Sequence, residues 1–506
     1  MLTRRNFHGG LASMAFGGLA LAGCSKLAIL PDAIARAPGF RRGDNRTDPI
    51  LGDLVPDLHS ERLLDLAEGL TYDAISCCGE PLDGGGVVPD SADGMGSFAL
   101  PGGRVALVRN HEIDAADFGK SAFPDAPPGP IEAWDRLHGR PLAGGTTTIV
   151  YDYVNHRFVR HYLSLAGTVR NCAGGATPWG TWLSCEENFS RGRQSDDRCH
   201  GWVFEVPADH GRLVRPEPLR DMGRFNHEAA AILPGEKKIV YLTEDRRDGL
   251  FYRFLPRVPG KLAEGGRLQA LALAGRFEGA DARNWTKPGI PVGTPMPVRW
   301  IDLEEVHCPD GDDLRKRGHQ AGATRFADGE GIHYGHGEFY FCVTSGGAIK
   351  SGQIMRYRPS PSEGEGEALE QASPPTLELF LESSDPATFN FGDNLTVAPN
   401  GHLVVCEDPY WGGRKTFLPR MVDGSAPCFL RGVTPAGIVY DVARLHGGSE
   451  LAGACFAPDG RTLFVNVMNP AKTLAIRATK GGRWDAGGPW GTPLPGWEIY
   501  PAQASV

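Results

Sequence analysis

The sequence lacks several features that define common protein classes. Beyond its start it has no apolar run of 18 residues, so no membrane-spanning helix is expected. It has no basic excess, because 52 Lys and Arg face 61 Asp and Glu and give a formal net charge of -9. The electrostatic footprint of a nucleic-acid-binding protein is therefore absent. With 68 Gly and 40 Pro, long helices must be few and turns numerous.

The first 24 residues have the features of an export signal. The run Thr3-Arg4-Arg5-Asn6-Phe7 is typical of a twin-arginine signal, and a mild apolar stretch from Gly9 to Ala22 follows it. The residues Leu21–Cys24 match a lipoprotein cleavage box, which would leave Cys24 as a lipidated N-terminus. We therefore expect an exported protein, periplasmic or held at a membrane only through Cys24, with residues 25–60 as a linker.

One sequence unit recurs six times along the rest of the chain. It consists of a Pro, Gly or Asn turn, a short β-rich run and a polar or acidic end, and it covers residues 100–112, 177–187, 233–245, 334–345, 398–408 and 457–469. Another ligand-type residue precedes each turn, namely Asp93, Cys172, Glu228, Glu330, Asp393 and Glu450. Since hairpin strands are antiparallel, both ends of one unit lie side by side. Six such hairpins predict an all-β, six-bladed β-propeller with ligand-type residues at one end of its axis.

The propeller is expected to form a single domain over residues 61–500. Residues 261–320 lack strand periodicity and are rich in Pro, Gly and charge, so we interpret them as a loop insertion over the axial face. Residues 360–371 are polar and acidic and are expected to form a flexible loop.

Acidic residues at the hairpin ends indicate a metal site. Like charges in a confined space repel each other, and the flanking arginines are too few to neutralise them. Such a concentration of carboxylates favours a hard cation such as calcium. Cys172 is the one soft ligand, and its thiolate would favour a transition metal such as iron, although a buried free thiol is the alternative interpretation.

Motifs distributed in order from about residue 64 to residue 470 resemble those of the PhoX-type alkaline phosphatases. The most specific are the loop Arg170-Asn-Cys-Ala-Gly-Gly175 and the run Cys185-Glu-Glu-Asn188, accompanied by Gly223–Ala229 and Tyr241–Asp245. The resemblance implies a six-bladed propeller with iron and calcium at one end of its axis. It also implies hydrolysis of small phosphate esters, here by a protein that we expect to be a monomer.

Carried over to this sequence, the resemblance assigns Cys172 as the thiolate ligand of iron. The acidic metal ligands would be Glu186 or Glu187, Glu228, Glu244, Glu330, Asp393, Glu407 and Glu450. Arg325 is a candidate for orienting the phosphate, since a guanidinium suits phosphate oxygens. His227 is a candidate for a phosphate contact or for the partner of a ligand. Metal ions would reverse the charge of the site, so no Ser, Cys or His nucleophile is expected.

Three departures from the family pattern predict a divergent member. Cys406-Glu-Asp408 continues into Pro-Tyr-Trp, Val467-Met-Asn-Pro470 replaces an expected His-Pro ending, and Arg325 lies five residues before Glu330. Two other functions fit the same residues. One is a calcium-dependent, lactonase-like propeller hydrolase, which needs no thiolate, and the other is a lipid-anchored binding propeller without enzymatic activity.

Overall fold

The computed structural model describes residues 51, 53–57, 62–125, 129–191, 198–286, 289–308, 311–409 and 426–479. All of them belong to one compact unit, which spans residues 38–506. The expected export signal and Cys24 lie outside the described residues. Within the described part of the chain, no helix is both long and apolar enough to span a membrane.

Among the described residues, strands form nearly all of the regular structure, and the two α-helices, α1 (Leu314–Gln320) and α2 (Glu367–Ala372), are short. Two sheets lie in the first part of the chain. One contains β4 (Ala92–Leu100), β5 (Arg104–His111), β8 (Gly144–Asp152) and β9 (Arg157–Thr168). The other contains β10 (Asn171–Ala176), β11 (Thr181–Glu186) and β12 (Val203–Pro207). A small ribbon pairs β6 (Arg136–Leu137) with β7 (Arg140–Pro141).

The middle of the chain forms a single nine-stranded sheet. In spatial order it contains β13 (His227–Ile232), β14 (Val240–Glu244), β15 (Phe251–Pro256), β16 (Gly266–Leu273), β17 (Met296–Asp302), β21 (Thr376–Glu382), β20 (Gln353–Arg358), β19 (Glu338–Val343) and β18 (Gly329–Gly335). The pairing of β17 with β21 joins its two halves.

The last two sheets combine both ends of the described chain. One has the order β22 (Gly392–Val397), β23 (Leu403–Glu407), β24 (Cys428–Val433), β25 (Val439–Leu445), β2 (Leu64–Ala67) and β1 (Leu54–Val55). The other has the order β26 (Leu451–Phe456), β27 (Leu463–Val467), β28 (Lys472–Ala478) and β3 (Leu70–Cys77). The N-terminal strands thus cover sheet edges that would otherwise lie open at the C-terminal end.

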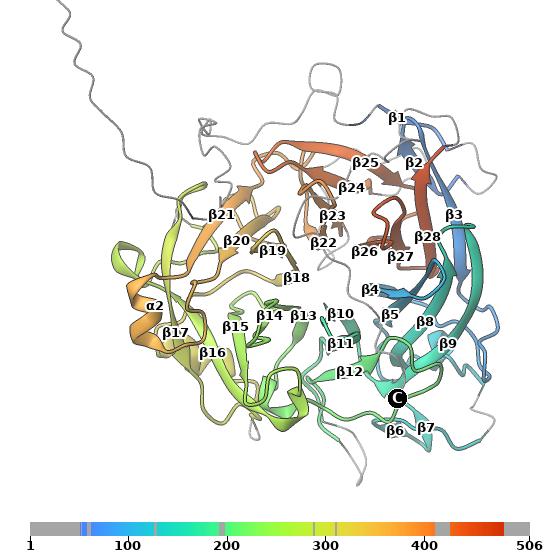
Figure 1. Ribbon diagram of the computed structural model, residues 1–506, viewed down its shortest axis with the longest axis horizontal. Coiled ribbons are helices and arrows are strands. Elements are labelled where there is room, and N and C mark those ends of the chain that lie inside the picture. Colours follow the sequence, from blue (N-terminus) through green and yellow to red (C-terminus); the bar gives the residue numbers. More distant parts are fainter. Residues whose placement is uncertain are drawn as a thin grey trace, which may run out of the picture. The chain divides into compact units, whose positions relative to one another are not determined.

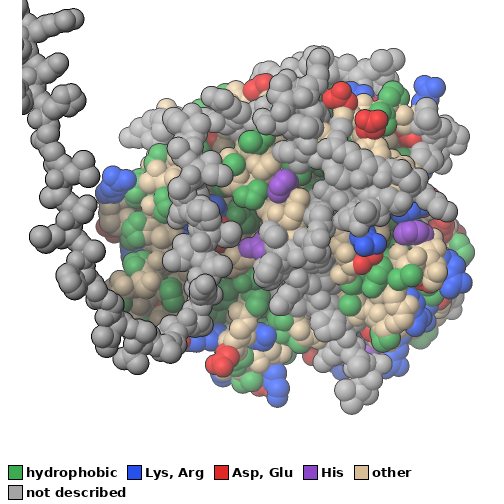
Figure 2. All heavy atoms as spheres, turned by 45° about the horizontal axis from the view of Figure 1, so that its top comes forward, with side chains coloured by type: hydrophobic (Ala, Val, Ile, Leu, Met, Phe, Trp, Pro, Cys, Tyr) green, Lys and Arg blue, Asp and Glu red, His purple; other side chains and the backbone are tan. Residues whose placement is uncertain are grey.

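The innermost strands β4, β10, β13, β18, β22 and β26 pack against one another in a closed ring, from which the sheets extend outward (Figure 1). The prediction of an all-β, propeller-like arrangement is confirmed. The sheets do not divide into six separate blades, because one of them has nine strands. In the view of Figure 2, basic and acidic side chains are interspersed over the described surface.

Two expectations about loops differ from the structure. Residues 261–320 contribute β16 and β17 to the nine-stranded sheet and also contain α1. The run Leu268–Leu273 is buried throughout, and a strand that is buried on both faces loses the alternation by which strands are recognised.

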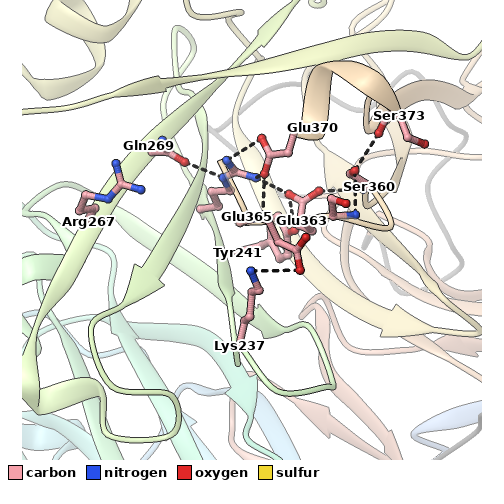
Figure 3. Close-up of polar contacts among 12 residues, drawn as sticks. Lys237, Tyr241, Arg267, Gln269, Ser360, Glu363, Glu365, Glu370 and Ser373 are labelled. Atoms are coloured by element: carbon pink, nitrogen blue, oxygen red, sulfur yellow. Dashed lines mark hydrogen bonds and ion pairs between the residues drawn. The ribbon is translucent and has the colours of Figure 1, made fainter. Parts of the chain in front are cut away.

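Residues 360–371, expected to be a flexible loop, are anchored by a buried ion network (Figure 3). Arg253 Nη1 donates to Glu363 Oε1 at 2.6 Å and to Glu370 Oε1 at 2.7 Å. Tyr241 and Tyr357 also donate to Glu363 Oε1, at 2.9 and 2.7 Å. The acidic composition of this segment therefore reflects fixed contacts with the outer strands.

Glycines allow the inner strands to approach one another closely. A Cβ atom at Gly94 in β4 would lie 2.4 Å from Cα of Ala173 in β10. A Cβ atom at Gly331 in β18 would lie 2.7 Å from Cα of Asn394 in β22. Both contacts are with backbone atoms, so the ring would have to widen to accept a side chain.

We predict that Gly94→Ala lowers the free energy of unfolding of the metal-free protein by about 1–3 kcal/mol, the usual cost of overpacking. Gly119→Ala is the matched control, because the nearest atom to a Cβ there is 3.9 Å away. Urea unfolding of the two variants measures the difference. Equal stability of the two variants would show that the ring adapts freely at Gly94.

Candidate metal centre

Each inner strand carries a β-bulge at the same level. In β10, Asn171 pairs with Glu186 and Gly174 pairs with Ser184, so that Cys172 and Ala173 together face one residue of β11. The other five inner strands have the same register shift. The first bulged residues are Asp93, Cys172, Glu228, Glu330 and Asp393, with Gly453 in the sixth strand. Because a bulge redirects a side chain, the repeated bulge presents five ligand-type groups in equivalent positions.

These side chains come together into an acidic cluster of seven residues: Asp93, Glu112, Cys172, Glu187, Glu228, Glu330 and Asp393. They form three groups, Asp93 with Glu112 and Cys172, Cys172 with Glu187 and Glu228, and Glu228 with Glu330 and Asp393. Within each group the potential ligand atoms lie within 4.8 Å of one another. Because Cys172 and Glu228 each belong to two groups, the cluster could hold neighbouring metal ions.

Burial and mutual repulsion make the ionised form of this cluster costly. Burial, followed by the charges of Asp393 and Asp93, raises the pKa of Glu228 well above its usual range. Burial and the neighbouring Asp408 raise the pKa of Asp393 to about 7. Burial also raises the pKa of the Cys172 thiol, with Asp93 next in effect. A bound cation would replace the protons that these groups otherwise retain.

Glu228 gives the clearest indication of a bound cation. Its side chain is 1% exposed, and neither carboxylate oxygen has a hydrogen-bond partner within the described chain. A buried charge without a partner costs several kcal/mol. Metal coordination would satisfy both oxygens, so the donor set of the cluster fits a metal ion.

One guanidinium partly offsets the charge of the cluster. Arg170 forms close ion pairs with both Glu112 and Glu187. This guanidinium cannot neutralise the other carboxylates of the cluster, namely Asp93, Glu228, Glu330 and Asp393. Arg170 is also held in the left-handed region, with φ 45°, directly before β10 begins at Asn171. Its contacts fix the two glutamates at one side of the cluster.

An amide from the neighbouring sheet fixes the bulge that carries Cys172. Asn110 Nδ2 donates to the carbonyl oxygens of Cys172 and Ala173 at 3.1 and 2.7 Å. Its Oδ1 accepts hydrogen bonds from Trp182 Nε1 at 3.0 Å and from Ser184 Oγ at 2.9 Å. The position of the thiol therefore depends on two sheets.

Four predicted ligands lie outside the cluster. Glu450 directly precedes β26 and lies beside Asp408, while Gly453 occupies the bulge position of that strand. The other three are Glu186, Glu244 and Glu407. Each ends the second strand of its hairpin and is engaged locally. Glu186 accepts from the backbone N–H groups of Val169 and Gly201. Glu244 accepts from Leu250 N and Tyr252 Oη, and Glu407 accepts from Asn390 N and Arg431 Nε.

The residue after each of these glutamates lies at the cluster instead. Glu187 is a member, Asp245 lies beside Glu187, and Asp408 lies beside Asp393 and Glu450. Successive side chains of an extended chain point in opposite directions. When the glutamate points away from the cluster, the side chain of the next residue therefore points toward it. Besides Asp245 and Asp408, the ligand assignment from sequence omitted Asp93 and Glu112, which stand at the two ends of the first repeated unit.

The two predicted catalytic side chains lie elsewhere. His227 is fully buried, with its ring 3.6 Å from that of Phe225 and Nε2 3.0 Å from the carbonyl oxygen of Gly223. Burial lowers its pKa to about 3, so this position suits a neutral core residue and not a phosphate contact. Arg325 Nη2 lies 3.5 Å from Asp281 Oδ2, and Asp281 is outside the cluster.

A buried histidine connects Glu186 to Asp135, which directly precedes β6. His200 donates from Nδ1 to Glu186 at 2.8 Å and from Nε2 to Asp135 at 3.2 Å. Burial opposes its protonation, but the two carboxylates outweigh this effect and raise its pKa to about 9. Its imidazolium thereby fixes the strand end that carries Glu187.

The raised pKa of His200 predicts a loss of stability at alkaline pH. In the unfolded chain the pKa of a histidine is about 6.5. The stabilisation from the His200 ion pairs is therefore complete below that pH and is lost as the pH rises through about 9. The difference amounts to about 3 kcal/mol. Chemical unfolding of the metal-free protein between pH 6 and 10 should show this decline. The His200→Gln variant should show it much less, and an equal decline in both proteins would contradict the assignment.

Behind the acidic cluster, the inner strands enclose an axial channel of about 200 Å³. At the level of the bulges its wall is formed by Gly94, Ala173, Ala229, Gly331, Asn394, Gly453 and Ala454. Small side chains at these positions leave the axis open while the ligand residues beside them form the cluster.

The family model described as alkaline phosphatase PhoX matches residues 135–471, which is more than half of the chain. Among solved structures, the fold is similar to that of Pseudomonas fluorescens PhoX in complex with vanadate, a transition state analogue. The TM-score is 0.62 at 20% identity, covering 86% of this chain and 99% of that one. A gluconolactonase from Xanthomonas campestris gives a TM-score of 0.33 at 12% identity, covering 85% and 98% of the two chains. No curated protein sequence matches the chain significantly.

Proposed function

The chain belongs to the PhoX family of alkaline phosphatases, and from this premise we propose that it hydrolyses phosphomonoesters at the acidic cluster. The products would be inorganic phosphate and an alcohol. The observation that carries the proposal is the buried carboxylate of Glu228, whose oxygens have no partner in the described chain. It lies in two of the three groups that could hold a metal ion.

Iron and calcium are the proposed metals. The thiolate of Cys172, with Glu187 and Glu228, offers the mixed sulfur and oxygen donors that suit iron. Glu228, Glu330 and Asp393 offer only oxygen donors, as calcium prefers. When bound, such cations contact phosphate oxygens and stabilise the negative charge that develops in the transition state.

The protein's own residues would prepare the site in two ways. Arg170 holds Glu112 and Glu187, and Asn110 holds the bulge of Cys172, so the ligands are oriented before substrate arrives. Burial of the cluster also limits the access of water to the buried carboxylates, which strengthens their electrostatic interactions. No side-chain nucleophile is proposed, because Cys172 would serve as a ligand and His227 is in the core.

We also propose that the domain is a six-bladed propeller. The closed ring of six inner strands supports this interpretation. The nine-stranded sheet would then consist of two blades, joined at their outer edges where β17 pairs with β21. The twin-arginine motif Arg4-Arg5 supports export, and Cys24 would be the lipidated membrane attachment. We further propose that the protein is a monomer.

The assay that tests the proposed activity uses 4-nitrophenyl phosphate with purified, metal-loaded protein. We expect turnover at alkaline pH, its loss after treatment with a calcium chelator, and its recovery when calcium is added back. Absence of phosphate release with every combination of iron and calcium would contradict the proposed function. Hydrolysis of lactones without phosphatase activity would favour the lactonase-like alternative.

A further inference from the structure

Three arginines that contact the acidic cluster or the residues beside it differ in how strongly they are already paired. Arg170 is engaged by Glu112 and Glu187. Arg315 is engaged by Asp248 at 2.8 Å and by Asp312 at 2.6 Å. Either guanidinium would have to leave buried or partly buried carboxylates to contact a substrate anion.

Arg246 is connected to the cluster through a neutral side chain. It follows Asp245, and its Nη2 donates to Asn226 Oδ1 at 2.6 Å. The amide Nδ2 of Asn226 donates in turn to Glu187 Oε1 at 3.2 Å. Two consecutive hydrogen bonds therefore connect this guanidinium with a carboxylate of the cluster.

The charge of Arg246 is offset less than that of Arg170 or Arg315. Its ion pair is with Asp312 Oδ2 at 3.5 Å, and the other oxygen of that carboxylate pairs with Arg315 at 2.6 Å. The Arg246 side chain is 32% exposed, whereas that of Glu187 is 10% exposed and Glu228 is buried. Arg246 therefore lies where the buried cluster meets solvent.

The backbone of Arg246 is fixed in this position. Its carbonyl oxygen accepts hydrogen bonds from Gly249 N at 2.8 Å and from Asp328 N at 2.9 Å. Asp245 N also donates to Asn226 O at 3.2 Å. These contacts hold the segment that carries Arg246 against the segment that carries Asn226.

We propose that Arg246 contacts the phosphate group of the substrate and that Asn226 is its positioning residue. A planar guanidinium can donate two parallel hydrogen bonds to a phosphate, and one of its edges is already oriented by Asn226. Arg325, the candidate from the sequence, pairs instead with Asp281. This inference rests on the proposed phosphatase function, since it assigns a phosphate contact at the same site.

Equilibrium binding of inorganic phosphate to the metal-loaded protein, measured by calorimetry, tests the inference independently of turnover. We expect Arg246→Ala to weaken phosphate binding about tenfold to a hundredfold, the usual effect of losing a hydrogen bond to a charged group. Arg246→Lys should restore only part of the affinity, because an ammonium is a point charge. Arg247→Ala is the matched control, since it removes the same charge from an exposed neighbour.

The positioning role of Asn226 has a separate readout. Asn226→Ala should weaken phosphate binding, and the double variant with Arg246→Ala should bind no more weakly than Arg246→Ala alone. Additive effects would mean that Asn226 acts on the site independently and would overturn its assigned role.

The remaining outcomes separate this inference from the proposed function. Phosphate binding that depends on Arg246, without ester hydrolysis, would support the contact and reject the hydrolytic function. Ester hydrolysis together with phosphate affinity that changes less than twofold in Arg246→Ala would overturn the contact. So would a loss of affinity in Arg325→Ala that Arg246→Ala does not share, or absence of phosphate binding to the wild-type protein.

Discussion

Glu228→Gln is expected to reduce phosphatase activity more than a hundredfold while making the metal-free protein more stable. Loss of a direct ligand should exceed the tenfold to hundredfold effect of losing a ligand's partner. In the metal-free protein, the neutral amide replaces a carboxyl group whose ionisation is costly in the cluster, and it can donate to the neighbouring carboxylates. Activity and stability should therefore change in opposite directions.

The pH dependence gives the sign of this stability effect. Burial raises the pKa of Glu228 in the folded protein, so its ionisation opposes folding once the pH exceeds the unfolded value of about 4.5. The gain in the free energy of unfolding, on the order of 1 kcal/mol or more, should be larger at pH 8 than at pH 5. Urea unfolding of the metal-free wild-type and variant proteins at both values measures it.

Glu186→Gln is the matched control, because Glu186 is equally buried but its oxygens accept hydrogen bonds from backbone N–H groups and from His200. An amide placed there turns an NH₂ group toward donors and should destabilise the protein by about 3–5 kcal/mol. If Glu228→Gln destabilised the metal-free protein similarly, Glu228 would be a structural residue and not a metal ligand.

Arg431→Met should strongly destabilise the protein. Arg431 is fully buried and pairs with Glu407 at 2.8 Å and closely with Asp441. Without it, two buried carboxylates lose their counter-charge, at a cost of about 3–5 kcal/mol. Thermal unfolding should show a large fall in the midpoint at pH 8 and a smaller fall at pH 5, where the carboxyl groups take up protons more readily.

A compensating variant tests the cause of this loss. Arg431→Met combined with Glu407→Gln and Asp441→Asn removes all three charges and should recover most of the stability, because neutral groups are less costly to bury. If the triple variant were as unstable as Arg431→Met, the loss would come from packing and not from unpaired charge.

The sequence pattern predicted the six hairpins and, in five of them, the ligand-type residue at the first end, because turn residues and strand runs are local signals. In the sixth unit it predicted Glu450, whereas Gly453 occupies the bulge position. Cys172, Glu228, Glu330 and Asp393 occupy the same bulge position in four inner strands. The bulge itself depends on pairing between strands and leaves no clear local signal.

The incorrect assignments also concern features that depend on contacts between strands and leave no local signal in the sequence. At the second hairpin ends, adjacent acidic residues differ only in the face to which they point, so the choice of Glu244 over Asp245 and of Glu407 over Asp408 could not be made from spacing. Because β16 is buried on both faces, its sequence lacks the alternation of apolar and polar residues that indicates a strand. The link from Arg246 through Asn226 to Glu187 joins the β13–β14 hairpin to the β10–β11 hairpin and depends on tertiary structure.

Elemental analysis of protein matured by twin-arginine export, for the wild type and for Cys172→Ala, tests the metal centre most directly. The same samples should be assayed with 4-nitrophenyl phosphate with and without added calcium. We predict iron and calcium in the wild type, loss of iron in Cys172→Ala, and calcium-dependent turnover only in the wild type. Calcium without iron in the wild type, together with no phosphate release, would contradict the proposed centre.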